Sequence, residues 1–414
     1  MKPKVIVIGG GPAGMMAAGQ AANNGAEVIL LEKMPALGRK LLLTGNGRCN
    51  FTNNRDIDEF YEYYGKNGQF LRNVFARFSN RDLIDFFKSQ GVDTTIGENG
   101  NIFPDTGRSK DIFNCLLDFI QEQKVQILTN WPAKSVTIEN NIVVDVVTNT
   151  EVFKCNSAII ATGGCSYPKT GSTGDGYKII NAIGHAVVPV RPGLVPLTGE
   201  ELVIRKLHGI SLPKVKVRLY IKDTMLAEHW GAMLFTNFGF SGPVILDLSC
   251  LVRPEHKDEN IRLYIDLMPD YTKNEIDRAF LKCIHEHGRM NIVNILSSFL
   301  PLRIASFIIE LCSISASMTG SEVSRGMRSK IIDKLGNIEF KVRGVRPLEE
   351  AMITIGGVAL SEINPKTMAS KLIKNLYLCG EIIDIAGVSG GYNLQAAFST
   401  GYVAGESAAM TVRA

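Results

Sequence analysis

The chain has 414 residues, of which 45% are apolar and 21% are charged, and these values are ordinary for a folded globular protein. Lys and Arg exceed Asp and Glu by only four residues, which is too small and too scattered an excess to indicate a nucleic-acid or anionic-membrane partner. The eight cysteines form no CxxC pair and no zinc-type cluster, so we expect reduced thiols and no metal site.

The N-terminal apolar run is too short for a signal peptide, and no stretch approaches the length of a membrane span. We therefore expect a cytoplasmic protein without membrane contact. A chain of this length also favours two or three domains over one core.

The first 32 residues have the pattern of a βαβ unit. Residues 5–8 are a continuous apolar, β-branched run, the alanine-rich segment 15–24 suits a helix ending at Gly25, and residues 26–32 are again strand-like. Such a unit implies a parallel sheet. Farther along, helices are predicted over 70–90 and 109–123, short strands over 125–155, and a buried strand from Ser157 to the paired glycines at 163–164.

The pattern changes after Pro189. Segments 214–221 and 261–267 alternate polar and apolar residues, which is typical of half-buried antiparallel strands. Thr272 and Glu275 form a capping box that opens a helix ending at Gly288. More helices are predicted near 291–297, 302–312 and 321–335, and apolar strands return at 353–355 and 375–380 before a glycine-rich turn and a final helix.

The sharpest motif is Gly9-Gly-Gly11-Pro12-Ala13-Gly14, directly after a strand and opening a helix. Gly9 allows the tight turn, Gly11 lets a pyrophosphate approach the backbone, and Gly14 lets helix and sheet pack closely. Glu32 ends the next strand and can accept hydrogen bonds from the hydroxyls of an adenosine ribose. We therefore predict a dinucleotide site here rather than a coincidental glycine turn.

A second glycine-rich segment near the C-terminus favours FAD over NAD. Gly380, Glu381 and Asp384 follow a strand, and Gly391, Tyr392, Asn393 and Leu394 open the last helix. Glu381 could bind the ribityl or pyrophosphate region, and amides at this helix start could stabilise the anion of a reduced flavin. An ordinary loop-to-helix junction is the alternative interpretation.

In its motifs and their order, the chain resembles the bacterial aminoacetone-oxidase-like or BaiN-like NAD(P)/FAD-dependent oxidoreductases of the glutathione-reductase-like FAD superfamily. The segments that carry this resemblance include VIVIGGGPAGMMAA, LLTGNGRCNFTN, ATGGCSYPKTGSTGDGY and LCGEIIDIAGVSGGYNLQ. The resemblance implies an α/β fold, in which a Rossmann-like FAD domain with a parallel sheet is interrupted by a β-barrel-like and a helical subdomain. Our expected boundaries are 1–190 with 350–414, 191–268 with 336–349, and 269–335.

The resemblance also assigns further cofactor contacts. It adds Lys33 at the ribose, Gly38, Arg39 and Lys40 near phosphates, and Ala133 near adenine. It places Asn46, Arg48, Cys49 and Asn50 close to the flavin ring, and Ala161, Thr162, Gly163 and Gly164 at a turn where the backbone approaches the cofactor. The chain departs from its relatives at Ala386, where glycine is more usual, and this puts the backbone shape near the flavin in doubt.

No catalytic residue stands out. Arg48, Cys49, Asn50 and Tyr167 are weak candidates, with packing, cofactor contact or an ordinary turn as the alternatives. None of the six histidines belongs to a motif that would make it a general base.

We therefore expect an FAD-dependent oxidoreductase that passes a hydride between a small-molecule substrate or NAD(P)H and non-covalently bound FAD. No second GxGxxG motif is present, so NAD(P)H, if used, would dock transiently. No nucleic acid is expected, and the oligomeric state is left open, as is the choice between oxidase and reductase. The alternatives are a tRNA-modifying flavoprotein and a flavin-bound sensor without turnover.

Overall fold

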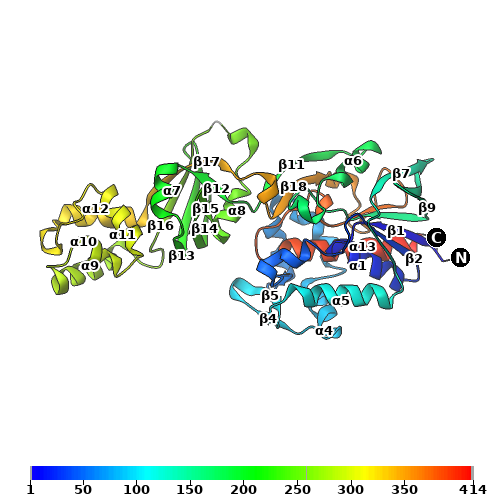
Figure 1. Ribbon diagram of the computed structural model, residues 1–414, viewed down its shortest axis with the longest axis horizontal. Coiled ribbons are helices and arrows are strands. Elements are labelled where there is room, and N and C mark those ends of the chain that lie inside the picture. The colour runs from blue at the N-terminus through cyan, green and yellow to red at the C-terminus, as the bar shows by residue number, and fades with distance from the viewer. Residues whose placement is uncertain (1, 258, 412–414) are drawn as a thin grey trace. The chain divides into compact units, whose positions relative to one another are not determined.

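The computed structural model describes residues 2–257 and 259–411, and the chain divides into two compact units. Unit 1 comprises Met1–Gly193 and Leu348–Ala414, and unit 2 comprises Leu194–Pro347. Figure 1 shows the two ends of the chain in unit 1. The fold class expected from the sequence is confirmed, whereas the finer boundaries inside unit 2 stay a prediction.

Unit 1 is built on a five-stranded parallel sheet in the order β19-β10-β1-β2-β6. Its strands are β1 (Lys4–Ile8), β2 (Glu27–Glu32), β6 (Gln126–Thr129), β10 (Ser157–Ile160) and β19 (Leu376–Leu378). In β1 and β10, residues 5–8 and 157–160 are all buried, because helices and a second sheet cover the strands. This explains why these strands read as continuous apolar runs.

Three smaller antiparallel sheets complete the strands of unit 1, in the orders β3-β5-β4, β7-β8-β9 and β11-β18. Their bounds are β3 (Thr52–Asn53), β4 (Thr94–Ile96), β5 (Asn101–Pro104), β7 (Ala133–Glu139), β8 (Ile142–Thr148), β9 (Val152–Lys154), β11 (Val187–Gly193) and β18 (Ile353–Val358). The helices of this unit are α1 (Pro12–Asn23), α2 (Ile57–Phe60), α3 (Arg72–Phe75), α4 (Asn80–Ser89), α5 (Ser109–Glu122), α6 (Asp175–Ala182) and α13 (Tyr392–Met410).

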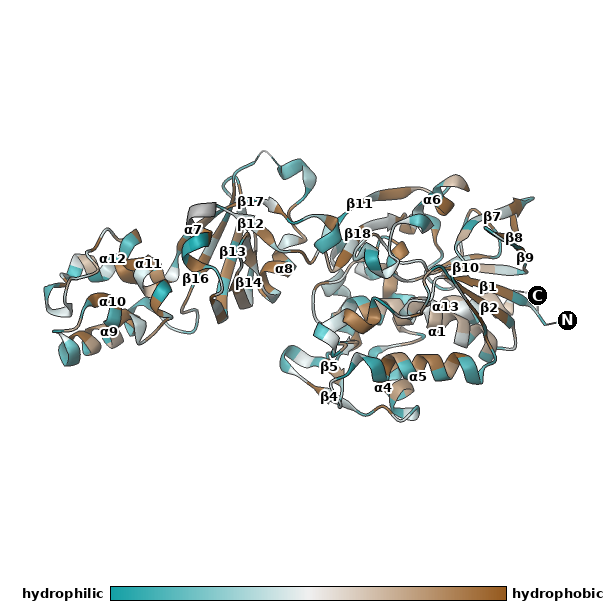
Figure 2. Ribbon diagram, in the orientation of Figure 1, coloured by the Kyte–Doolittle hydropathy of each residue, from teal (hydrophilic) through white to brown (hydrophobic). Residues whose placement is uncertain are grey.

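Helices α1 and α13 lie side by side, although one is near the start of the chain and the other ends it (Figure 1). A Cβ atom at Gly401 would lie 2.4 Å from the carbonyl oxygen of Ala13, and one at Gly405 would lie 2.3 Å from that of Ala17. Glycine is therefore required at both positions for this close approach. Helix α5 has apolar and polar faces, as expected for a helix at the edge of a core (Figure 2).

The single helix predicted over 70–90 is wrong in its extent. The chain forms α3, leaves the helix after Phe75 and starts again at α4. The reason is local: the Ser79 side chain accepts a hydrogen bond from the amide of Asp82, and the Asp82 carboxylate accepts one from the amide of Ser79. This capping box begins a new helix.

Unit 2 contains a closed barrel in the order β12-β15-β14-β13-β16-β17. Its strands are β12 (Leu197–Gly199), β13 (Ser211–Ile221), β14 (Thr224–Phe235), β15 (Gly239–Ser241), β16 (Ile261–Asp266) and β17 (Ile338–Val345). Its helices are α7 (Glu201–Leu207), α8 (Pro243–Ser249), α9 (Lys273–His287), α10 (Ile292–Ser297), α11 (Leu302–Leu311) and α12 (Arg325–Gly336). Barrel and helices share one hydrophobic core, in which Phe307 stacks on Phe340.

Candidate functional site

The glycine loop after β1 leaves open space at one glycine only. Gly9 has φ +106°, and a Cβ at Gly14 would lie 1.8 Å from the carbonyl oxygen of Gly9, so both positions exclude a side chain. At Gly11, in contrast, an added Cβ would meet no atom within 4 Å. The N-terminus of α1 also has no side-chain cap, so its first amides are available to an anion.

Glu32 ends β2 beside this loop and is held by two backbone amides. Its Oε2 accepts a hydrogen bond of 2.7 Å from the amide of Gly10, and its Oε1 accepts one of 2.8 Å from the amide of Met34. These bonds fix the carboxylate but leave it lone pairs for a ligand's hydroxyl groups. The next residue, Lys33, forms a 2.5 Å ion pair with Asp175. Burial alone would raise the pKa of Asp175, but its hydrogen bonds from Lys33 and Thr173 lower it below the usual value.

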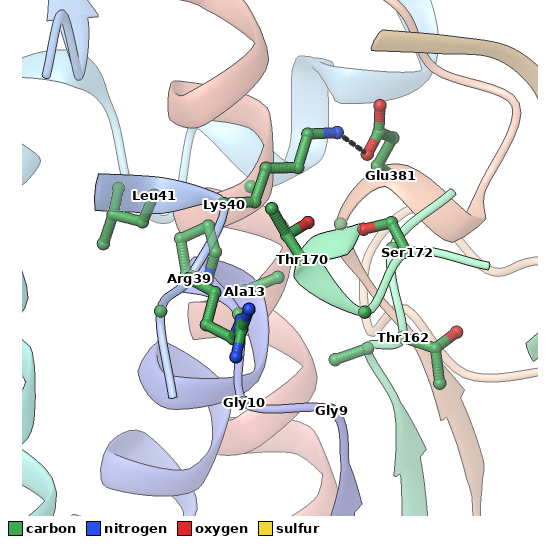
Figure 3. Close-up of a pocket in the computed structure, with 18 of the residues that line it drawn as sticks. Gly9, Gly10, Ala13, Arg39, Lys40, Leu41, Thr162, Thr170, Ser172 and Glu381 are labelled. Atoms are coloured by element: carbon green, nitrogen blue, oxygen red, sulfur yellow. Dashed lines mark hydrogen bonds and ion pairs between the residues drawn. The ribbon is translucent and has the colours of Figure 1, made fainter. Parts of the chain in front are cut away.

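Arg39 and Lys40 are neighbours in sequence that serve different parts of the site. Figure 3 shows the Arg39 side chain extending toward the turn at Gly9 and Gly10, and that of Lys40 extending toward Glu381. The Arg39 guanidinium donates to the carbonyl oxygen of Lys169 at 3.2 Å. Arg39 therefore supplies a positive charge beside the loop at which we predict phosphate binding.

The Glu381 carboxylate is occupied by donors from the protein itself. Its Oε2 accepts from Nζ of Lys40 at 2.7 Å, and its Oε1 accepts from the amide of Thr354 at 2.7 Å and from Oγ of Ser166 at 3.2 Å. The amide of Gly164 adds a longer contact of 3.4 Å. Glu381 lines the cleft, but its charge is largely used to join four segments of unit 1.

A second helix N-terminus opens at the same cleft. Helix α13 begins after Gly391, which has φ +92° and provides no side-chain cap. Asn393 and Leu394, in the first turn of α13, line the cleft together with Ala13 of α1. Two helix N-termini, each with partial positive charge, are therefore exposed to one cavity.

These elements surround a cleft of about 1430 Å³, its open mouth included. Its lining comes from both chain segments of unit 1, and part of it is drawn in Figure 3. The open cradle at Gly11, two uncapped helix N-termini, the Arg39 cation and a fixed carboxylate at Glu32 match the phosphates and ribose of FAD.

Most of the residues predicted to bind the cofactor line this cleft. They are Gly9, Gly11, Pro12, Ala13, Glu32, Lys33, Gly38, Arg39, Lys40, Ala133, Ala161, Thr162, Gly163, Gly380, Glu381, Asn393 and Leu394. The remainder do not belong to its lining: Gly14, Asn46, Arg48, Cys49, Asn50, Gly164, Asp384, Gly391 and Tyr392. Gly14 and Gly164 act instead through close packing, and Asp384 accepts a hydrogen bond from Asn67.

The loop over 44–50 reaches the cleft only through Thr44. The exposed guanidinium of Arg48 lies over the ring of Phe103, 4.8 Å from its centroid. Cys49 is fully buried, and this burial raises the pKa of its thiol to about 12, which disfavours a reactive thiolate. The Asn50 side chain has a buried Oδ1 atom without a hydrogen-bond donor among the described residues.

Tyr167 adopts a left-handed backbone conformation, with φ +53°, in the loop after the glycine pair at 163–164. Its carbonyl oxygen accepts hydrogen bonds from the amide and the hydroxyl of Thr170, which lines the cleft. The Tyr167 side chain itself does not line the cleft.

Several residues that line the cleft were not predicted from the sequence. Trp131 lies beside Ala133 on the cleft wall, and its amide donates to the carbonyl oxygen of Glu32. Met352, Ile353 and Ile385 are apolar residues that look like ordinary core in the sequence. A tryptophan two residues before the expected adenine contact was a usable signal, whereas the apolar residues carried none.

No helix in the described part of the chain is long and apolar enough to cross a membrane. Within residues 2–257 and 259–411, no group of three or more His, Cys, Asp or Glu side chains could hold a metal ion.

Comparison with known proteins gives a consistent picture over nearly the whole chain. The family model for the HI0933-like protein Rossmann domain matches residues 3–407. The 3-dehydro-bile acid delta(4,6)-reductase of Clostridium scindens is 29% identical over 409 residues, covering 98% of this chain and 99% of that protein. The ribosomal RNA dihydrouridine synthase of Haemophilus influenzae is 32% identical over 403 residues, covering 96% of each protein.

Solved structures share the fold at lower identity. A flavocytochrome c3 fumarate reductase in an open conformation has a TM-score of 0.53 and 18% identity, covering 99% of this chain and 78% of that chain. The 3-ketosteroid delta1-dehydrogenase of Sterolibacterium denitrificans has a TM-score of 0.53 and 13% identity, covering 98% of this chain and 99% of that chain.

Proposed function

The chain belongs to the HI0933-like Rossmann family and is an FAD-dependent oxidoreductase, and from that premise we propose that it reduces a carbon–carbon double bond conjugated with a carbonyl group. The named activities of its relatives support this choice. A delta(4,6)-reductase of a 3-dehydro bile acid and a dihydrouridine synthase both add hydrogen to such a double bond. The two substrates differ, but both reactions reduce the same kind of double bond.

The cleft carries this proposal, because both of its uncapped helix N-termini favour negative charge. In our assignment, the N-terminus of α1 and the Arg39 guanidinium bind the phosphates, and Glu32 binds the adenosine ribose. The first turn of α13 faces the ring end of the cofactor and stabilises the negative charge of its reduced form. When bound, FAD supplies the hydride chemistry, with NAD(P)H as a reductant that docks transiently.

The test uses the purified holoenzyme, photoreduced in the absence of oxygen and mixed with candidate acceptors. A steroid 4-en-3-one and a uridine-containing ribosomal RNA represent the two classes of conjugated double bond, and a saturated 3-keto steroid is the matched control. We expect at least one unsaturated acceptor to reoxidise the flavin and to gain two hydrogens by mass spectrometry. An enzyme that is reoxidised only by oxygen, and that is reduced by small amines, would be an oxidase and would overturn the proposal.

The substrate is either a free small molecule or a uracil base in ribosomal RNA. We favour a small molecule, because the cleft in unit 1 is already lined for one dinucleotide and Lys and Arg equal Asp and Glu in that unit. Ribosomal RNA is the second candidate for two reasons. Relatives in Haemophilus influenzae and Escherichia coli are ribosomal RNA dihydrouridine synthases, and the chain's net charge of +4 lies in unit 2.

A genetic experiment separates these two substrates. Dihydrouridine in ribosomal RNA is measured by mass spectrometry in cells that lack the protein and in cells complemented with the wild type or with Gly11→Ala. Unchanged dihydrouridine in all strains supports the small-molecule substrate. Loss of the modified base, restored by the wild type and not by Gly11→Ala, would establish RNA as the substrate.

A further inference from the structure

The position of the α13 N-terminus depends on the turn at 387–391 that precedes it. Gly390 has φ +120° and Gly391 has φ +92°, so this turn uses conformations that other residues rarely adopt. Asn393 closes the turn from within, because its side chain accepts from the amide of Gly387 and donates to the carbonyl oxygens of Gly387 and Val388. The turn is therefore closed by its own hydrogen bonds, and contacts from outside the turn position it against the rest of unit 1.

Asn53, on the short strand β3, is one of the contacts that hold the turn from outside, together with the carbonyl oxygen of Tyr63, which accepts from the amide of Val388. Its side chain is buried, and Nδ2 donates to the carbonyl oxygen of Gly390 at 3.2 Å, to that of Asn99 at 3.1 Å and to Oδ1 of Asn101 at 3.3 Å. Its Oδ1 accepts from the amide of Arg55 at 3.2 Å. One amide group thus joins the 387–391 turn to the β4–β5 hairpin and to its own strand.

The neighbouring residue, Thr52, also contacts the turn and the helix that follows it. A Cβ at Gly391 would lie 2.4 Å from the carbonyl oxygen of Thr52, so the backbone of the turn already rests on β3. The Thr52 hydroxyl also donates to Oε1 of Gln395, one turn into α13. β3 therefore contacts α13 at its start and one turn later.

We propose that Asn53 is a positioning residue that sets the reduction potential of the flavin through the α13 N-terminus. The favourable effect of a helix N-terminus on an anion falls off within its first turn, so a small displacement of that turn weakens it. Asn53 does not itself line the cleft, and it acts by holding Gly390. This inference rests on the proposed function in one respect, which is the placement of the flavin ring at α13.

The test compares Asn53→Ala with Asn80→Ala in the holoenzyme. Asn80 is a matched control, because it is also buried and its Nδ2 donates to the carbonyl oxygens of Asn53 and Arg55, each at 2.8 Å, without touching the 387–391 turn. Both substitutions remove buried hydrogen bonds from the same segment, so both should lower Tm. Only Asn53→Ala should lower the affinity for reduced FAD relative to oxidised FAD, by about two- to fivefold, and so lower the potential.

The potential is measured by equilibration with a redox dye at saturating FAD, which requires no substrate. Asn53→Leu, which keeps the size of the side chain and adds no charge, repeats the measurement if the alanine variant is too unstable to isolate. Equal potentials in the Asn53 and Asn80 variants would overturn the inference, whether or not the enzyme reduces a double bond. A lowered potential in the Asn53 variants alone would support it, even if every double-bond acceptor fails.

Discussion

Nζ of Lys40 lies 2.7 Å from Oε2 of Glu381, so the two chain segments of unit 1 meet in an ion pair on the wall of the cleft. Each side chain is about one-fifth exposed, at 23% and 21%, which makes the pair partly screened by solvent. Oγ of Ser166 accepts a further hydrogen bond from Lys40 at 2.6 Å. The ion pair joins the segment after β2 to the segment after β19.

The first prediction concerns this pair. Lys40→Met should lower the free energy of unfolding by about 1–3 kcal/mol, because Glu381 keeps its charge and loses its cation. The double variant Lys40→Met/Glu381→Gln should recover part of that loss, with a coupling of roughly 0.5–3 kcal/mol. Urea unfolding at constant excess FAD measures both values. Strictly additive effects would show that the two side chains do not stabilise each other.

A second prediction separates the two roles of glycine in the loop at 9–14. Gly11→Ala should leave the fold intact and abolish retention of FAD, because the added methyl group enters the open space assigned to phosphate. Gly14→Ala should prevent folding of unit 1, because its Cβ would lie 1.8 Å from the carbonyl oxygen of Gly9. Circular dichroism and the flavin absorbance band measure the two outcomes. A Gly11→Ala protein that folds and retains FAD, and is therefore yellow, would contradict the assignment of phosphate binding to Gly11.

The third prediction tests the cation beside the loop. Arg39→Ala should raise the Kd for FAD about 10- to 150-fold, which corresponds to the loss of a charge-assisted hydrogen bond of roughly 1.5–3 kcal/mol. Arg108→Ala is the control, because Arg108 pairs with Asp111 and does not line the cleft. Fluorescence titration of the FAD-free protein gives both constants, and the Arg39 variant should also show a weaker dependence on salt. Equal losses in both variants would contradict the phosphate assignment.

The fourth prediction concerns pH and the thiol of Cys49. Because burial raises its pKa to about 12, roughly one thiol in ten thousand is ionised at pH 8 in the native protein. Iodoacetamide should therefore leave Cys49 unmodified between pH 7 and 9.5, whereas in urea its alkylation should become faster as the pH rises. Peptide mass spectrometry measures the modification site by site. Rapid native labelling of Cys49 would mean that the 44–50 loop opens and that the thiol is available for chemistry.

The sequence by itself determined the fold class, and it predicts where the phosphates of the cofactor bind. The glycines between the apolar strand and the helix can be explained locally. Each of them permits a tight turn, a close approach of the ligand or a packing contact within a few residues. For the same reason the acid that ends β2 could be recognised without a structure. The FAD-dependent activity followed from the order of motifs along the chain, and the family match supports it.

The tertiary structure alone decided which polar groups serve the cleft and which serve the scaffold. The sequence predicts Glu381 as a cofactor contact and gives no sign of a role for Asn53. Neither residue's partner could be predicted, because Lys40 and Gly390 lie 341 and 337 residues away in the chain. The contact of the Arg48 guanidinium with the Phe103 ring is likewise visible only in the folded chain, and the placement of Arg48 near the flavin stays a prediction. Two hydrogen-bond partners that lie so far apart in the chain produce no periodic pattern or fixed spacing in the sequence. They meet only when folding brings the donor and the acceptor within about 3 Å of each other.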